Sequence, residues 1–152
     1  MNLDETMLAL KAAGTEQTRK TYRRHGYPEN TFGVSFVELK EFAKELDGNQ
    51  KLARELWATG NGDACTLATM IADPEQTSSR ELDAWVKDIH FGLLSQMLAR
   101  YVVDTDFARE KVTQWTKSPE EFVAETGYQV LSLLALQMRN SMTTTSPAIC
   151  GP

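Results

Sequence analysis

The stretch Trp85–Tyr101, WVKDIHFGLLSQMLARY, decides the fold, because it holds the end of one helix, a tight corner at Asp88–His90 and the start of a second helix. Apolar residues recur at helical spacing in the second helix and give it one buried face. These residues are Leu93, Leu94, Met97, Leu98, Tyr101 and Val102. Two helices joined by so short a turn are typical of a helical hairpin.

Signals for helix starts repeat along the chain. A serine or threonine that can cap a helix precedes several apolar-periodic segments, and most of these caps are followed by a glutamate three residues later or by a proline. These caps are Thr15, Ser35, Ser78 and Ser118. No segment shows the two-residue alternation of a strand. The sequence therefore predicts eight or nine helices and no sheet.

Two further patterns favour stacked repeats. The segment Asp63–Ala72 is apolar on nearly every side, which is typical of a helix packed between others. Ala53–Arg54–Glu55 precedes Trp57, and Ala108–Arg109–Glu110 precedes Trp115, at offsets of 55 to 58 residues. Degenerate repeats of the HEAT type give such echoes. We therefore expect an all-α, HEAT-like helical-repeat solenoid (an α-α superhelix). The expected buried side chains are Leu67, Met70, Trp85, Leu94, Leu98 and Leu131.

The length of 152 residues predicts one domain, which we place at residues 1–139, followed by a disordered, non-periodic tail at 140–152. The sequence contains no apolar run long enough for a membrane span and no signal peptide at its N-terminus. Cys65 and Cys150 are the only cysteines, and two isolated cysteines favour reduced thiols in a cytoplasmic protein.

Charge is unevenly distributed. The net charge of −5 argues against a nucleic-acid surface over the whole chain, but residues 1–26 carry +2 and the remainder −7. Arg19, Lys20, Arg23 and Arg24 fall within a stripe of roughly 140° on one helix. With the adjacent Tyr22, this group is the best candidate for binding. The same pattern is also typical of a solvated charged face.

The residues give little support for catalysis. Ser95 has no histidine one helical turn away, and His90 has no second metal ligand nearby, so we expect neither a nucleophilic serine nor a metal or cofactor site. The three tryptophans lie in register with apolar neighbours, which favours packing over stacking on a base. Asp83 and Lys87 have the spacing of an ordinary surface pair.

Several segments, taken together, resemble the DNA alkylation repair (AlkD-like) glycosylase family. They are KTYRRHG, GVSFVELKEFAKEL, LARELWATGNGDACTLATMIADP, ELDAWVKD and WTKSPEEFVAETG, and the resemblance covers about Arg19–Met138. It implies a HEAT-like solenoid with a concave face toward DNA. It also implies, for active members, excision of cationic alkylpurines such as 7-methylguanine and 3-methyladenine without base flipping, helped by a carboxylate.

The family's Trp-Asp-x-x-Asp site aligns with Phe91–Ser95, so Phe91 stands at the aromatic position and Ser95 at the position of the catalytic aspartate. A neutral serine cannot stabilise a sugar cation, an effect commonly worth several kcal/mol. Glu125 stands where the family has an arginine near the DNA backbone, whereas Tyr22 matches a family tyrosine near DNA.

Our first hypothesis is therefore a DNA-binding scaffold of this family without glycosylase activity, monomeric, that binds double-stranded DNA weakly through phosphates. The second is an active glycosylase with a displaced carboxylate, Asp88 or Asp104. The third is a scaffold for protein partners, since solenoid grooves bind helices and peptides as readily as nucleic acid.

Overall fold

The computed structural model describes residues 1–149, and it describes side chains as far as residue 141. Within this part the chain forms nine helices and no strand. They are α1 (Leu3–Ala13), α2 (Glu16–Arg24), α3 (Phe36–Leu46), α4 (Gln50–Ala58), α5 (Gly62–Ile71), α6 (Ser79–Asp88), α7 (Gly92–Val103), α8 (Ala108–Trp115) and α9 (Glu121–Ile149). The predicted all-α class is confirmed. None of the helices in the described residues is long and apolar enough to cross a membrane.

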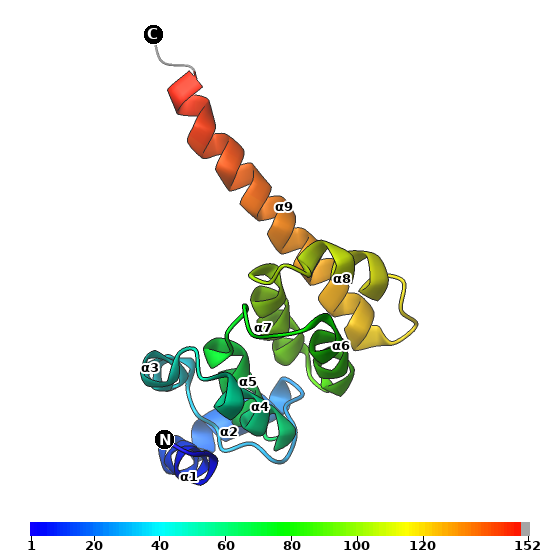
Figure 1. Ribbon diagram of the computed structural model, residues 1–152. Helices are drawn as coiled ribbons and strands as arrows, with labels where there is room; N and C mark the ends of the chain where they lie inside the picture. The colour runs from blue at the N-terminus through cyan, green and yellow to red at the C-terminus, as the bar shows by residue number, and fades with distance from the viewer. Residues whose placement is uncertain (150–152) are drawn as a thin grey trace.

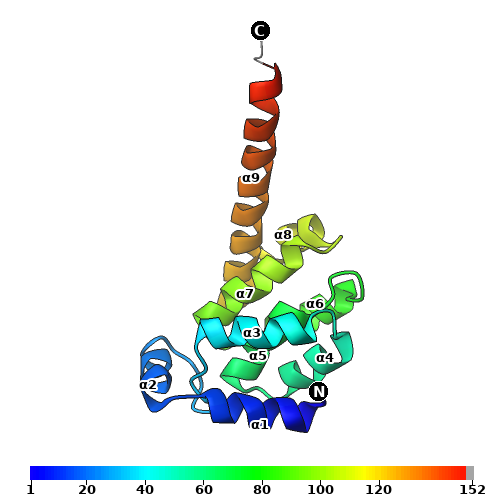
Figure 2. The same ribbon diagram turned by 90° about the vertical axis from the view of Figure 1, so that its left-hand side faces the viewer.

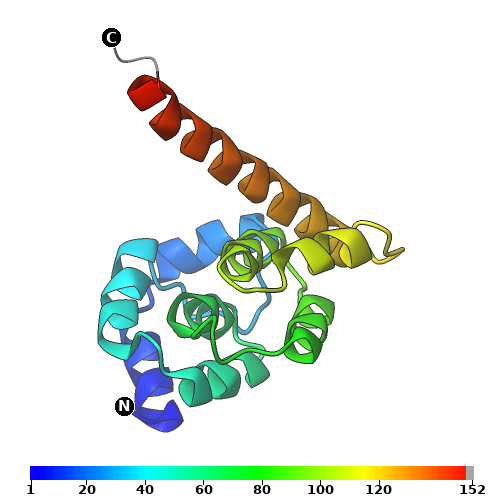
Figure 3. The same ribbon diagram turned by 45° about the horizontal axis from the view of Figure 1, so that its top comes forward.

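The helices stack as antiparallel pairs in two layers (Figure 1). One layer runs α3, α5, α7 and α9, each packed on the next, and α4 and α8 cover it from the other side through contacts with α5 and α9. Figure 3 looks down on this arrangement, with α5 at the centre of the body. Two helices depart from it. Figure 2 shows α2 at the edge of the body and α9 projecting well beyond it.

The core confirms most of the predicted burial. Leu67, Leu94 and Leu98 have no exposed surface, Trp85 is 5% exposed, and nearly every residue of α5 is buried. Met70 is only half-buried, and the prediction for Leu131 is wrong, because its side chain is 47% exposed. Leu131 borders an apolar groove beside α8. Helical periodicity therefore predicted the apolar face of this helix but not how much of that face the described helices cover.

Helices α4, α6 and α8 are the first helices of three successive pairs. Side chains of α6 form hydrogen bonds with both of the others. The indole N–H of Trp57 on α4 donates to Asp88 Oδ2 at 3.0 Å, and that of Trp115 on α8 donates to Asp83 Oδ1 at 2.9 Å. Trp57 also stacks on Trp85, with ring centroids 4.4 Å apart. Trp57 and Trp115, the two tryptophans of the internal sequence similarity, therefore occupy comparable positions on either side of α6, as expected for stacked repeats.

The expected surface pair of Asp83 with Lys87 is not the main contact of Asp83. Its carboxylate instead accepts a hydrogen bond from Lys111 Nζ at 2.9 Å, and this lysine has no exposed surface. Lys111 also donates to Ser79 Oγ at 2.6 Å. The spacing on one helix could not show a partner that comes from another helix.

Several helices begin at the capping residues that the sequence predicted. Thr15, Ser35 and Ser78 each cap the helix that follows by accepting a backbone N–H. The last helix differs from expectation, since it was predicted to end near residue 139 and its backbone continues to Ile149. No glycine or proline interrupts it between Gly127 and Pro147, and extending a helix is easier than starting one. Residues 150–152 of the predicted tail lie outside the described residues.

Candidate nucleic-acid interface

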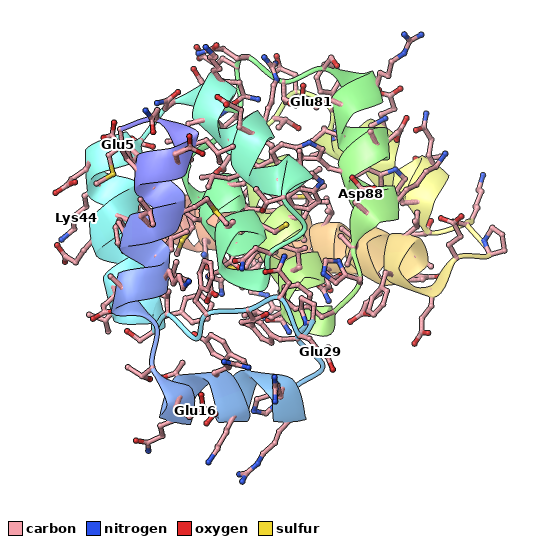
Figure 4. The ribbon with its side chains drawn as sticks, turned by 90° about the horizontal axis from the view of Figure 1, so that it is seen from below. Glu5, Glu16, Glu29, Lys44, Glu81 and Asp88 are labelled. Atoms are coloured by element: carbon pink, nitrogen blue, oxygen red, sulfur yellow. The ribbon has the colours of Figure 1, made fainter. Side chains whose placement is uncertain are left out.

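Helix α2 is the most polar helix of the chain and buries none of its residues. Lys20, Arg23 and Arg24 are exposed, and two of them fall in the last turn of the helix, where cations interact favourably with its dipole. Figure 4 shows α2 at the edge of the body with nitrogen-tipped side chains directed away from it. We call these three residues the α2 cationic face.

Tyr22 and Arg19, predicted to belong to the same group, turn toward the protein. The Tyr22 hydroxyl donates to the carbonyl oxygen of Val34 at 2.6 Å, and its ring stacks on Tyr27 at 4.2 Å. Burial, with a smaller contribution from the charge of Asp63, raises the pKa of Tyr22 to about 12. Arg19 is half-buried and lies 3.7 Å from Glu16. The structure therefore brings three of the five predicted residues together and uses the tyrosine to fix α2 in place.

The aromatic contact of Tyr22 continues inward to the corner before α7. The ring of Tyr27 packs on Phe91 at 4.4 Å, and Phe91 meets His90 edge-on at 5.0 Å. Phe91 is 1% exposed, whereas His90 is exposed. Phe91, which the resemblance aligns with the family's aromatic residue, therefore packs in the core, and its ring is one layer of the aromatic stack behind α2.

The buried carboxylate of Asp63 fixes the loop that follows α2. Asp63, near the start of α5, accepts backbone N–H groups from Phe32 at 2.5 Å, Gly33 at 3.2 Å and Val34 at 3.0 Å. The carboxylate is 1% exposed, and its burial raises its pKa although the three N–H donors act in the opposite direction. We call Asp63 and these three donors the Asp63 clamp. It holds the loop that Tyr22 also contacts.

Sequence reasoning missed the Asp63 clamp. The only signals were an acidic residue at a helix start and a glycine in the preceding loop. Gly33 has φ +84°, and a Cβ there would lie 2.6 Å from backbone atoms of Thr15 and Arg19. Glycine is therefore required both for the backbone conformation and for the close approach of α2.

Ser95, which the resemblance aligns with the family's carboxylate, is fully buried between α7 and α9. Its Oγ lies 2.7 Å from Thr126 Oγ1, and Thr126 in turn donates to the carbonyl oxygen of Phe122. Since the threonine proton is used in that bond, the Ser95 hydroxyl is the donor between the two. Ser95 thus joins two helices, and its hydrogen-bond partner among the described residues is a neutral hydroxyl and not a base that could activate it as a nucleophile.

The other acidic residues singled out from the sequence are Asp88, Asp104 and Glu125. Asp88 is exposed and accepts the Trp57 indole N–H, and Asp104 is exposed at the end of α7. Glu125 is half-buried and accepts the side-chain amide of Gln129 at 3.2 Å. The side chains that the structure describes include no group of histidine, cysteine, aspartate and glutamate residues that could hold a metal ion.

The likeness to known proteins extends over most of the chain. An uncharacterised protein of Listeria innocua, Lin0241, is 25% identical over 138 residues, which are 87% of this chain and 62% of that protein. A solved structure described as "A new family of proteins related to the HEAT-like repeat DNA glycosylases with affinity for branched DNA structures" superposes with a TM-score of 0.82 at 35% identity, covering 86% of this chain and 56% of the other. This chain thus spans about three fifths of the length of both relatives. The family model described as DNA alkylation repair enzyme matches residues 6–146, and the chain therefore belongs to the DNA alkylation repair enzyme family, with a HEAT-like helical-repeat fold.

Proposed function

We propose that this chain is a DNA-binding scaffold of the DNA alkylation repair family that binds duplex and branched DNA through phosphates and excises no base. The observation that carries the proposal is the α2 cationic face, because it places three exposed cations on one outward side of a helix whose orientation is fixed from behind. Phosphate contacts supply most of the affinity in sequence-independent binding. The affinity for branched DNA described for the structural relative supports the choice of ligand.

The negative charge of the rest of the molecule limits the strength of this interaction. Residues outside the first 26 carry −7, so we expect weak, sequence-independent association with duplex DNA in the range of about 10⁻⁴ to 10⁻⁶ M at physiological salt, as for other non-specific binding. A junction brings several phosphate backbones close together, and a compact cluster of cations can contact more than one of them. We therefore expect tighter binding to a four-way junction than to a duplex of the same sequence.

Fluorescence anisotropy with a labelled junction and a labelled duplex tests the proposal. Changing Lys20, Arg23 and Arg24 to alanine should weaken binding at least about tenfold and reduce the log–log salt slope by up to about 3, since each lost phosphate contact removes about 0.9. The matched control changes three exposed cations on other helices, Lys40, Lys51 and Lys87, and so alters the net charge equally. Absence of binding at low salt, or equal losses in both triple variants, would contradict the proposal.

The lack of excision is proposed from the surroundings of Ser95. A neutral hydroxyl that is buried and bonded to Thr126 offers no anion to a developing sugar cation. Incubation with methylated DNA should therefore release no 7-methylguanine or 3-methyladenine above background. Ser95→Asp should restore no excision, because its carboxylate would lie between α7 and α9. Release by the unchanged chain that disappears in Asp88→Asn or Asp104→Asn would instead support an active glycosylase.

A further inference from the structure

The four cations of α2 fall into two rows along the helix. Residues four positions apart on an α-helix lie nearly above one another, separated by about 6 Å along its axis. Arg19 and Arg23 have this spacing, and we call them the inner row. Lys20 and Arg24 have it too, and we call them the outer row. Counted around the axis from Tyr22, which faces the body, the inner row lies at about 60° to 100° and the outer row at about 160° to 200°.

The inner row lies in the angle between α2 and the body of the molecule. The backbone of Arg19 is so close to the following loop that a Cβ at Gly33 would lie 2.6 Å from the Arg19 nitrogen. The side chain of Arg19 is nevertheless 38% exposed, so a ligand can reach it. Both residues of the outer row are exposed on the side away from the body. Helix α2 therefore presents cations toward two different directions.

The protein does not fill the hydrogen-bonding capacity of Arg19. Its Nε is buried and has no hydrogen-bond partner among the described residues. Its Nη1 lies 3.7 Å from the carboxylate of Glu16, whose side chain is 66% exposed. Exposed ion pairs of this kind are weak, whereas a guanidinium binds phosphate through strong, charge-assisted hydrogen bonds. A phosphate can therefore compete with Glu16 for Arg19.

We propose that Arg19 determines a preference of this chain for branched DNA. The inner row, with Arg19 added to Arg23, holds a strand of one arm in the angle between α2 and the body, while the outer row holds a strand of another arm. Phosphates of one strand recur about every 3.4 Å along a duplex, so each row is long enough to contact two of them. This inference rests on the proposed function, because it concerns the same helix.

The surroundings of α2 favour a branch over a continuous duplex. Figure 4 shows Glu16 on α2 and Glu29 in the loop near the other end of the helix. These carboxylates restrict the cationic stretch to the length of α2, and the residues after the first 26 carry −7. A continuous duplex along α2 would bring further phosphates toward negative charge, whereas the arms of a branch diverge on the two sides of the helix.

Fluorescence anisotropy of the full chain, with a labelled four-way junction and a labelled duplex of the same sequence, tests the inference. Arg19→Gln should weaken junction binding about tenfold and reduce its log–log salt slope by about 0.9, the value of one phosphate contact, while duplex binding changes less than about twofold. The matched control Lys20→Gln removes the same charge from the neighbouring position and should weaken binding to both DNAs to a similar extent. Circular dichroism checks that both variants keep the helical fold.

Glu16→Gln is a second variant with the opposite expected effect. Glu16 is exposed, so the fold should persist, and the released Arg19 should tighten junction binding about two- to threefold with a smaller change on the duplex. Equal effects of Arg19→Gln on the two DNAs would overturn the inference, because net charge alone would explain them, and so would an unchanged chain that binds the junction no tighter than the duplex. If the unchanged chain binds neither DNA, the proposed function fails and this inference fails with it. If it binds both and Arg19→Gln is not selective, only this inference fails.

Discussion

The region around α2 and the region around α8 are each held by one aspartate, but the two carboxylates lie in opposite settings. Asp63 is 1% exposed, and its three donors in the Asp63 clamp are uncharged backbone N–H groups. The side chain of Asp83 is 42% exposed, and its partner Lys111 is the fully buried member of the pair. In both regions the most damaging loss should be that of the residue that satisfies a buried group, which is Asp63 for the three backbone N–H groups and Asp83 for the Lys111 cation.

The largest effect is expected for Asp63→Ala. It would leave the N–H groups of Phe32, Gly33 and Val34 without their acceptor, and each unsatisfied buried donor costs about 1–3 kcal/mol. We expect the free energy of unfolding to fall by about 3–5 kcal/mol, measured by urea denaturation. Asp4→Ala, an exposed aspartate on α1, is the control. A loss below about 1 kcal/mol would show that water replaces the carboxylate easily.

The same variant connects this region to function. The loop held by Asp63 also accepts the Tyr22 hydroxyl, so its release should detach α2 and weaken DNA binding even though no cation is removed. Tyr22→Phe is the milder counterpart, since it removes one hydrogen bond and keeps the ring on Tyr27. If Asp63→Ala stays folded and binds DNA unchanged, the α2 cationic face does not require a fixed orientation.

The second effect concerns the α8 region and depends on which partner is removed. Asp83→Ala leaves the buried Lys111 cation without its anion, and breaking a buried pair in this way costs about 3–5 kcal/mol. Because Ser79 and Gln114 still accept from Lys111, we expect a loss near 3 kcal/mol. Lys111→Met removes the buried charge and leaves a half-exposed carboxylate, so it should cost no more than about 1 kcal/mol. Equal losses in urea denaturation would contradict the asymmetry.

These two regions also show what the sequence could predict. Caps, apolar stripes and the buried faces of α5 and α7 were all predicted, because they depend on residues a few positions apart. The Asp63 and Asp83 contacts join residues about 30 positions apart, and only the stacking of successive helices makes them neighbours. Leu131 illustrates the converse, since local periodicity identifies an apolar face but does not supply its partner.

For the candidate site, too, the sequence predicted the element but not the orientation of every side chain. The charge pattern predicted that α2 is the basic helix, and its composition in the structure agrees. The assignment of Tyr22, Phe91 and Ser95 to positions of the family's site rests on the resemblance and stays a prediction. Which of these side chains faces solvent depends on the loop after α2 and on the corner before α7. Phe91 is buried because Tyr27 covers it, and Ser95 because α9 crosses it. Neither neighbour can be identified from spacing alone.

The smallest effect is a difference in how the two regions respond to acid. Burial alone would raise the pKa of Asp83, but hydrogen bonds from Lys111 and Trp115 and the lysine charge hold it below its ordinary value of 3.8. The stabilising contribution of Asp83 is therefore present above that pH and is lost as the pH falls through the lower pKa of the folded state. For Asp63, whose folded pKa is raised, the contribution is largest below pH 3.8 and declines as the pH rises through the folded pKa.

Urea denaturation from neutral pH to about pH 3 compares the free energy of unfolding of the unchanged chain with that of each variant. The difference from Asp83→Asn should shrink as the pH falls, while the difference from Asp63→Asn should change in favour of the unchanged chain. Parallel trends for the two asparagine variants would show that the carboxylates sit in similar electrostatic settings and would remove the contrast between the regions.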